Sequence, residues 1–380
     1  MVALPSAVAS ALLPVLVALG AAVAVDSTFG EPPRRLHPVA WFGSTIEPFD
    51  RRWSRPRSVG VVVAVGLPLV VAAVAGVAVA AVLHGVRAVT GVAAALDVGW
   101  ILGPLVVGAI LSTTMSLRML LDVTAAVVAL TASDPEAARE SVRALVGRET
   151  ATLSPSALRS AAVESAAENL ADGFVAPLVG FVVGAVIGGS LLIAGVGFVG
   201  VSADVLPLSL GVAGAVWVKA VNTLDSMLGY RSKPVGWASA RLDDAVMYVP
   251  ARTTAVCLVI AAVAVYSIAP GDTLTRVRQW AELPSSPNAG WPMAAAAAVL
   301  DVRLAKSGHY ALNPEADLPT PADAERAVTL VRLAGVVAIG AAAATLVAAA
   351  VAMGWLAAQP GGSLTRLEIP LSTSGVVAPC

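Results

Sequence analysis

The stretch GVAGAVWVKAVNTLDSMLGYR, residues 211–231, joins an apolar run to a dense group of polar side chains. The residues before Lys219 suit a lipid bilayer, because none of them is charged. Polar side chains then follow within a few helical turns, namely Asn222, Thr223, Asp225, Ser226, Tyr230 and Arg231. This change predicts a membrane helix that ends in a functional group of side chains. The alternative is an ordinary interfacial helix end, with Lys219 reaching toward water.

The composition of the 380-residue chain indicates a polytopic membrane protein. Hydrophobic residues make up 57% of the chain and charged residues only 13%, whereas soluble domains carry about 25% charged residues. The net charge of -1 and the lack of a basic tail give no indication of a nucleic-acid partner. Cys257 and Cys380 belong to no CxxC or Cys/His cluster, which disfavours a zinc site or a disulfide framework.

Apolar runs long enough to cross a bilayer define the expected membrane helices. They cover residues 7–25, 59–83, 99–130, 174–199, 252–269 and 333–357, and a shorter run covers 204–221. Because lipid offers the backbone no hydrogen-bond partners, we expect an all-α polytopic integral membrane helix bundle with about five to eight membrane segments. The first run lacks the basic residues that begin a signal peptide, so we expect a retained helix. One membrane domain is predicted over 1–358, followed by a flexible tail over 359–380.

Four polar connections separate these runs, and each is basic at its membrane edges. They cover residues 26–58, 132–172, 222–251 and 270–332. The positive-inside rule places all four in the cytoplasm, which predicts a multi-pass protein of the cell membrane with cytoplasmic helical loops. Only the run 252–269 separates the last two connections. Either this run is a hairpin, or the last connection lies on the opposite side of the membrane from the other three. We expect all four connections to lie on one side.

The second connection contains clear helix signals. SDPE, residues 133–136, is a capping box with proline at the first helical position, and Ser154-Pro155 opens a further helix that Gly173 is expected to end. Within that helix, Glu164, Glu168 and Asp172 recur every four residues and therefore share one face.

Such a row of carboxylates, with Ser165 and Asn169 beside it, has two interpretations. Like charges at this spacing repel each other, and oxygen-rich clusters suit Mg²⁺, which favours a metal site. The alternative is an exposed acidic face beside the membrane. In the opening stretch, one helix face likewise carries Lys219, Asn222, Thr223 and Ser226, with Asp225 one turn beyond Asn222.

Three further constellations carry polar groups. In ARLDDAVMYVPAR, residues 240–252, the candidates are Arg241, Asp243, Asp244 and Arg252, although Arg241 and Asp244 also have the spacing of a simple helix pair. SSPNAGWPM, residues 285–293, places Asn288 before a helix N-terminus, where phosphate binds readily. DSTFGEPPRRLHPVAWFGS, residues 26–44, is a tight loop with His37 before a proline, a position more often structural than catalytic. The sequence has no GxxxxGK[ST], GxSxG or HExxH motif, so ATP would bind without a Walker loop.

Taken together, these segments resemble the adenosylcobinamide-phosphate synthase family, the CobD/CbiB membrane proteins of cobalamin biosynthesis. The matching stretches, in family order, are GEPPRRLHPV (30–39), ESAAENLADGFVAPL (164–178), KAVNTLDSMLGYR (219–231), ARLDDAVMYVPAR (240–252) and SPNAGWPMAAAAAVLDVRL (286–304), with Tyr310 beyond. The chain departs from the family pattern after Tyr230, where it is several residues shorter. It also departs at Met247, where asparagine is common, and at Ala305-Lys306, which replace glycines.

The resemblance implies an enzyme that uses ATP and Mg²⁺ to join aminopropanol phosphate, or aminopropanol, to adenosylcobyric acid through an amide bond. We expect acidic residues to hold Mg²⁺ and deprotonate the amine, arginines to hold phosphate, and asparagines to orient substrate amides. The expected catalytic residues are Glu164, Glu168, Asp225 and Asp244; the expected metal ligands are Glu168, Asp172, Asp225 and Asp243; the expected substrate or phosphate ligands are His37, Asn169, Asn222, Ser226, Arg231, Arg241, Arg252 and Asn288.

Two other functions fit a polar cluster on a membrane protein. A transporter would place its substrate groups at mid-membrane depth, whereas the polar motifs here fall mainly in loops and at helix ends. A scaffold that gathers late corrinoid-pathway enzymes would need no dense polar constellation. We therefore expect an enzyme whose partners are its corrinoid and amine substrates and the lipid bilayer, with other late-pathway enzymes and a second copy of the chain as further candidate partners.

Overall fold

The computed structural model describes residues 3–92, 99–143, 150–194, 203–266 and 269–357, and nearly all of these residues are helical. The α-helices are α1 (Ala3–Phe29), α2 (Pro38–Ile46), α3 (Pro56–Val92), α4 (Gly99–Ser112), α5 (Leu117–Ser133), α6 (Pro135–Val142), α7 (Pro155–Leu170), α8 (Ala176–Ile193), α9 (Val205–Leu228), α10 (Trp237–Val246), α11 (Tyr248–Tyr266), α12 (Pro270–Ala281), α13 (Gly290–Leu300) and α14 (Pro321–Ala357). The shorter elements are the 3-10 turns η1 (Arg34–Leu36), η2 (Glu47–Phe49) and η4 (Pro234–Gly236), the π segment η3 (Ala171–Val175), and the antiparallel strands β1 (Leu304–Lys306) and β2 (Tyr310–Leu312).

The described residues include six helical segments that are long and apolar enough to cross a membrane. They are Pro56–Thr90, Gly99–Ser133, Pro155–Ile193, Val205–Leu228, Tyr248–Tyr266 and Pro321–Leu356, and α1 adds a shorter apolar stretch over Leu13–Phe29. The all-α class and the multi-pass membrane character are thus confirmed. The predicted tail over 359–380 lies outside the described residues.

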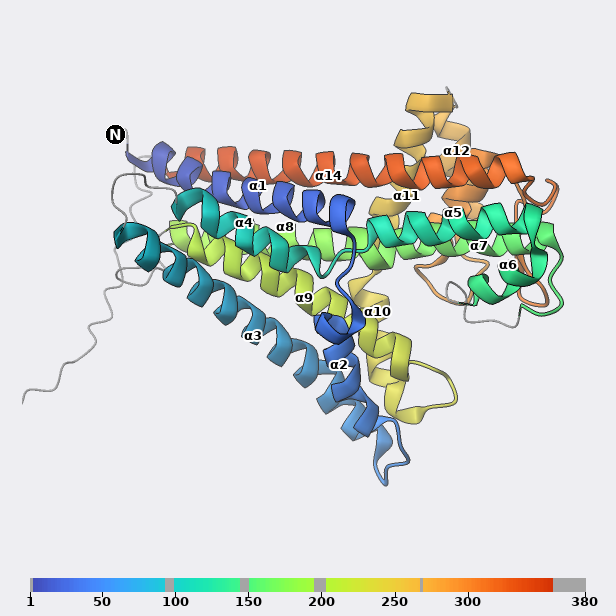
Figure 1. Cartoon of the computed structure of the whole chain (residues 1–380), viewed down its shortest axis with the longest axis horizontal. Helices are drawn as coiled ribbons and strands as arrows, with labels where there is room; N and C mark the ends of the chain where they lie inside the picture. The colour runs from blue at the N-terminus through green and yellow to red at the C-terminus, as the bar shows by residue number, and fades with distance from the viewer. Residues whose placement is uncertain (1–2, 93–98, 144–149, 195–202, 267–268, 358–380) are drawn as a thin grey trace, which may run out of the picture.

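The helices are spread along the longest axis of the molecule (Figure 1), and their sequences make one half apolar and the other polar. The apolar half, at the left of the view, contains α1, α4, α8, much of α3 and α9, and the last part of α14; the polar half contains α5, α6, α7, α12 and the start of α14. The apolar half presents large apolar side chains to its surroundings, such as Val77 at 70% exposure and Val351 at 68%. Contact with lipid accounts for this exposure, so the membrane crosses this half.

Most of the run 252–269 belongs to α11, Tyr248–Tyr266. α11 lies across the long axis instead of along it, and α12, which contacts α11, brings the chain back into the polar half (Figure 1). The connections that follow α1, α5, α9 and α11 all lie away from the end of the molecule at which α1 begins (Figure 1). α11 is one continuous helix, Tyr248–Tyr266, so this run is not itself a hairpin, and one shared membrane side for the four connections stays a prediction.

Two predicted element boundaries were wrong. Gly173 does not end a helix: α7 passes through the π segment η3 and continues as α8. The residue that caps α6 is Asp134, whose Oδ1 accepts hydrogen bonds from the amides of Glu136 and Ala137; Ser133 is the last residue of α5. Pro135 does begin α6, and Ser154 caps α7 as predicted. The expected span over 99–130 falls within one candidate span, Gly99–Ser133, in which the chain leaves helical geometry between α4 and α5.

Glycines allow α8 and α9 to pack closely in the apolar half. A Cβ atom at Gly180 would lie 2.6 Å from the carbonyl oxygen of Gly214, and one at Gly184 would lie 2.0 Å from that of Leu210. Neither position has room for a side chain. Because lipid tails are as apolar as side chains, close backbone contact of this kind is a main source of helix association in membranes.

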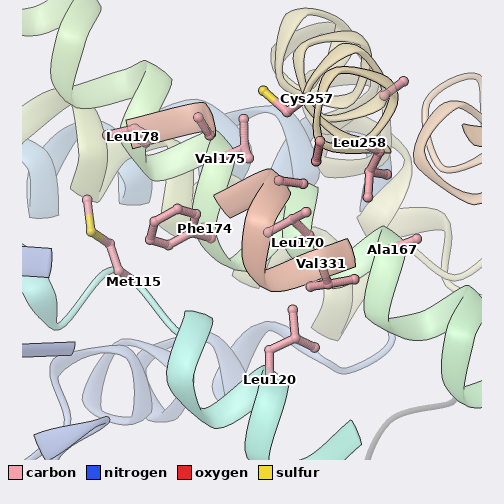
Figure 2. Close-up of a cluster of buried hydrophobic side chains, with 14 of the residues drawn as sticks. Met115, Leu120, Ala167, Leu170, Phe174, Val175, Leu178, Cys257, Leu258 and Val331 are labelled. Carbon is pink, nitrogen blue, oxygen red and sulfur yellow. The ribbon is translucent and has the colours of Figure 1, made fainter. Parts of the chain in front are cut away.

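A buried apolar cluster fixes η3 where the two halves meet. Figure 2 shows Phe174 of η3 beside Leu170 of α7, Leu258 of α11 and Val331 of α14. Phe174, Leu170 and Leu258 are at most 1% exposed. Since burial of each such side chain contributes about 1.5–3 kcal/mol, this cluster sets the position of the polar residues that flank η3.

Candidate active site

A pocket of about 1060 Å³ lies where the apolar helices meet the polar half. Four segments that are far apart in the sequence supply its lining. They are the end of α1 with the following loop and α2, the start of α5, the junction of α7 with η3, and the last turns of α9. The volume reaches the upper end of the range of about 300–1,000 Å³ that small-molecule sites span, which indicates a large ligand.

The loop between α1 and α2 forms a stiff wall of this pocket. Pro38 begins α2, and His37 caps it by accepting a hydrogen bond at Nδ1 from the amide of Val39 at 3.2 Å. The other ring nitrogen, Nε2, lies 3.2 Å from Oε2 of Glu31. His37 lines the pocket, and both its ring nitrogens have protein partners, which fits the structural role considered for it; its role in substrate binding stays a prediction.

The polar floor of the pocket comes from η3 with the end of α7, and from α9. It consists of Asn169, Asp172, Lys219 and Asn222. Asn169 donates through Nδ2 to the backbone oxygen and to Oγ of Ser165, both at 2.9 Å, which holds its amide in place. Lys219 interacts electrostatically with Asp172 and with Glu31, which belongs to the loop between α1 and α2. The floor thus presents a cation, a carboxylate and two amides to one ligand.

An acidic cluster lies behind Asn222. Its Nδ2 is 3.5 Å from Oδ1 of Asp243 on α10, at the limit of a hydrogen bond. Burial, followed by the charges of Asp172 and Asp225, raises the pKa of Asp243 to about 8. Burial also raises the pKa of Asp244, although Arg241, 3.6 Å away, opposes the shift. This part of the protein therefore concentrates negative charge and stabilises bound protons or cations.

The predicted Mg²⁺ ligands are not gathered into one coordination sphere. Among the described residues, no group of three or more His, Cys, Asp or Glu side chains is arranged to hold a metal ion. Two of them nevertheless fit the donor chemistry, because Mg²⁺ is commonly held by one or two carboxylates together with substrate phosphates. Oδ1 of Asp225 is buried and has no hydrogen-bond partner in the described structure, and Asp243 is crowded by like charges.

Glu164 and Asp172 share the four-residue spacing, but only Asp172 lines the pocket. Glu164 is 4% exposed and accepts hydrogen bonds from Ser160 Oγ at 2.9 Å and from the Tyr310 hydroxyl at 2.8 Å. It thereby joins α7 to the β1–β2 hairpin instead of lining the pocket. The half-buried Glu168 lies between the two and is also absent from the lining.

Arg252 and Asn288 brace three helices against one another. Nη1 of Arg252 donates to Oδ1 of Asn288 at 3.1 Å, and the guanidinium stacks over the rings of Tyr248 and Trp291. Asn288, only 5% exposed, donates to the backbone oxygen of Asp244 at 2.7 Å. These contacts join the segment before α13 to α10 and α11, so both side chains have structural partners outside the pocket.

The remaining predicted ligands lie on the surface. Ser226, Arg231 and Arg241 are exposed, and Ser226 Oγ donates to the backbone oxygen of Asn222 at 2.9 Å. None of the three lines the pocket. Their assignment to substrate binding stays a prediction that the geometry does not support.

The pocket also contains charged residues that sequence analysis does not select as ligands. They are Glu31, Arg34, Arg35, Glu47, Arg118, Asp122 and Lys219. Arg118 donates from Nη1 to the backbone oxygen of Ser27 at 2.9 Å and contacts Asp122 at 3.3 Å. The sequence does contain a sign that Arg118 and Asp122 belong to a site. Both interrupt an apolar run, and charged residues within membrane segments usually serve a function.

Fold and site together define a multi-pass helical membrane protein with a large polar pocket at one end of its apolar helices. The family model described as CobD/Cbib protein matches residues 19–339, and the chain belongs to this family.

Curated relatives match over most of their length. The chain is 32% identical to the probable cobalamin biosynthesis protein CobD of Methanothrix thermoacetophila, over 83% of this chain and 92% of that protein. It is 36% identical to the cobalamin biosynthesis protein CobD of Rhodobacter capsulatus (82% and 91%) and 37% identical to that of Mycobacterium tuberculosis (81% and 88%). No solved structure matches the chain.

Proposed function

We propose that this chain works in cobalamin biosynthesis, as the names of its relatives state for them, and that it is an adenosylcobinamide-phosphate synthase. In the proposed reaction, ATP drives formation of an amide bond between (R)-1-amino-2-propanol phosphate, or aminopropanol, and adenosylcobyric acid. The observation that carries the proposal is the pocket itself. It gathers the polar residues of the segments 30–39, 164–178 and 219–231 around a space suited to a large substrate.

The chemistry requires activation of a carboxylate, which an amine does not attack directly. ATP can supply this activation by transferring its terminal phosphoryl group to the carboxylate, giving ADP and an acyl phosphate. The amine nitrogen then bonds to the carbonyl carbon, phosphate leaves and the nitrogen loses a proton. The chain must therefore hold anions, place a carboxylate beside an amine, and accept a proton.

Residues of the pocket fit each of these tasks. Lys219 on the floor and Arg34 and Arg35 on the rim provide positive charge for phosphate or carboxylate oxygens. Asn169 and Asn222 also line the pocket, and we assign them the orientation of amide groups of a substrate. Asp172 is the carboxylate of the floor, and we assign it the proton from the amine.

Asp225 and Asp243 are the residues that would hold Mg²⁺ beside this pocket. When bound, the ion would neutralise charge on the phosphate oxygens of ATP. Two observations support this assignment: Oδ1 of Asp225 is buried without a hydrogen-bond partner among the described residues, and burial together with neighbouring carboxylates raises the pKa of Asp243. Asp243 would need to lose its proton before it binds the ion.

We assign the end of the molecule that carries the pocket to the cytoplasm. All four connections rich in arginine and lysine lie at this end (Figure 1), which is the side that the positive-inside rule favours for basic loops. ATP is available there. The location of the polar residues, where the apolar stretches end, also favours an enzyme over a transporter, whose substrate groups would lie midway along its helices.

The test is an amide-forming assay with the purified protein in detergent or nanodiscs. Adenosylcobyric acid, Mg-ATP and aminopropanol are supplied with or without the phosphate, and products are identified by mass. An ATP-dependent amide product in the wild type, lost in Asp172→Asn, supports the proposal. Uptake of a corrinoid into proteoliposomes without chemical change would instead support a transporter, and capture of pathway enzymes without any product would support a scaffold.

A further inference from the structure

Three exposed apolar side chains line the pocket although they lie on three different elements. Phe29 ends α1 and is 82% exposed, Trp41 of α2 is 55% exposed, and Met119 of α5 is 45% exposed. Single exposed apolar residues are common on protein surfaces, but their gathering around one polar pocket is not. The pocket therefore combines an apolar rim with the polar floor described above.

Trp41 is held in a fixed position on this rim. Its Nε1 donates to the backbone oxygen of Arg35 at 2.9 Å, so the indole is fastened to the loop that precedes its own helix. That loop is stiffened in turn by the contact of His37 with Glu31 and by its cap on α2. A ring that is already positioned loses little conformational freedom when a ligand stacks on it.

The ligand that fits must be large, with an extended face that is mostly apolar and with polar groups at its edge. A free phosphate or aminopropanol offers no such face. The adenine ring of ATP is flat but small beside a rim built from three separate elements around a pocket of about 1060 Å³. A corrin macrocycle meets both requirements, because its face is broad and its edge carries amides and a carboxylate.

We propose that Phe29, Trp41 and Met119 form a platform for one face of the corrin ring, with Trp41 as its fixed centre. The edge of the ring that bears the reacting propionate then lies over the floor, within reach of Lys219 and Asn222. This inference rests on the proposed function. It assigns the corrinoid to the side of α2, and it leaves the acidic cluster near α10 to the nucleotide.

The experiment compares Trp41→Ala with Trp237→Ala, a matched change of an exposed tryptophan (49% exposed) outside the pocket lining. The KM for adenosylcobyric acid is expected to rise at least fivefold in Trp41→Ala, while the KM values for ATP and for the amine change less than twofold. Trp237→Ala should resemble the wild type. Trp41→Phe keeps a ring but loses the hydrogen bond, and it should lie between wild type and alanine.

Two results would overturn the platform. A selective rise in the KM for ATP in Trp41→Ala would make Trp41 a nucleotide contact. Unchanged KM values, together with quenching of Trp41 fluorescence by brominated lipid, would make it a membrane contact.

A binding measurement separates this inference from the proposed function. Cobyric acid without ATP is titrated against intrinsic tryptophan fluorescence in the wild type and in Trp41→Phe. The same titration is made with Trp41→Ala, and an affinity for cobyric acid at least fivefold weaker in this variant supports the platform even if no amide product is found in any condition. A wild type that makes the amide while Trp41→Ala keeps the same corrinoid affinity refutes the platform and leaves the proposed function intact.

Discussion

The backbone amide of Ser116 donates a hydrogen bond to the carbonyl oxygen of Gly173 at 3.1 Å. Oγ of Ser116 lies at the same distance from this oxygen and also donates to it. The break between α4 and α5 is thereby tied to the π segment of a neighbouring helix, at the level of the pocket. Pi segments are rare and often mark functional sites, and here the segment carries Asp172 to the pocket floor.

The contact between these two residues leaves no room for a larger side chain. A Cβ atom at Gly173 would lie 2.5 Å from Oγ of Ser116, so Gly173→Ala should lower the stability by about 1–3 kcal/mol and amide formation by about 100-fold through displacement of Asp172. Thermal unfolding and kcat/KM measure the two effects. Because Oγ is the clashing atom, Ser116→Ala in the same chain should recover most of both losses. A double variant no better than Gly173→Ala would contradict this explanation.

Removal of the charge of Lys219 should weaken the reaction without unfolding the protein. Hydrogen bonds from a charged donor to an anion contribute about 1.5–3 kcal/mol, so Lys219→Met should reduce kcat/KM by roughly 10–150-fold. Lys219→Arg keeps the charge and should lose less. The comparison uses initial rates of amide formation at matched thermal stability. Equal losses in the two variants would show that the shape of the lysine matters, and not its charge.

Asp243 should make both stability and Mg²⁺ binding depend on pH. Its pKa is about 8 in the folded protein and near 4 in the unfolded chain, so between these values the folded state binds the extra proton. Without Mg²⁺ the midpoint of thermal unfolding should therefore fall as the pH rises from 6 to 8.5. The affinity for Mg²⁺ should rise by up to about tenfold per pH unit in the same range, because the ion displaces this proton. In Asp243→Asn, the thermal midpoint and the Mg²⁺ affinity should both become nearly independent of pH in this range. If either quantity still changes with pH, a group other than Asp243 causes that change.

Close packing of α8 on α9 predicts a sharp contrast between two glycine substitutions. Gly184→Ala places a methyl group where only 2.0 Å separates it from the oxygen of Leu210, whereas a Cβ atom at Gly66 meets no atom within 4 Å. Gly184→Ala should therefore lower the thermal midpoint and the yield of folded protein. Gly66→Ala should leave both unchanged or slightly improved, since alanine favours helix. If Gly184→Ala and Gly66→Ala have similar thermal midpoints and yields, α8 and α9 can move apart at little cost in stability.

Much of the fold could be predicted from hydrophobicity alone, because long apolar runs leave few structural alternatives in a membrane. The boundary at Gly173 was predicted wrongly because glycine is a local stop signal, whereas the cluster around Phe174 keeps the helix continuous through a π segment. The four-residue spacing of the carboxylates likewise predicted that Glu164 and Asp172 belong to one cluster. Spacing cannot report that Tyr310, distant in sequence, takes up the first carboxylate.

The site could be predicted only in part, for a related physical reason. Asn169, Asp172, Asn222 and His37 reach the pocket because they sit at the ends of apolar stretches, a position that sequence reveals. Sequence does not reveal how distant segments meet. The contact of Arg252 with Asn288 depends on how α11 and α13 are arranged. The crowding of carboxylates that raises the pKa of Asp243 likewise depends on where α10 lies.

The transverse course of α11 also determines how the protein can be handled in experiments. Since α11 and α12 return the chain to the polar half, α14 runs back toward the end of the molecule where α1 begins (Figure 1). Ala3 and Ala357 thus both lie at the end opposite the pocket. An affinity handle attached near either position and fixed to a surface would leave the pocket facing the solution, open to reagents added from above.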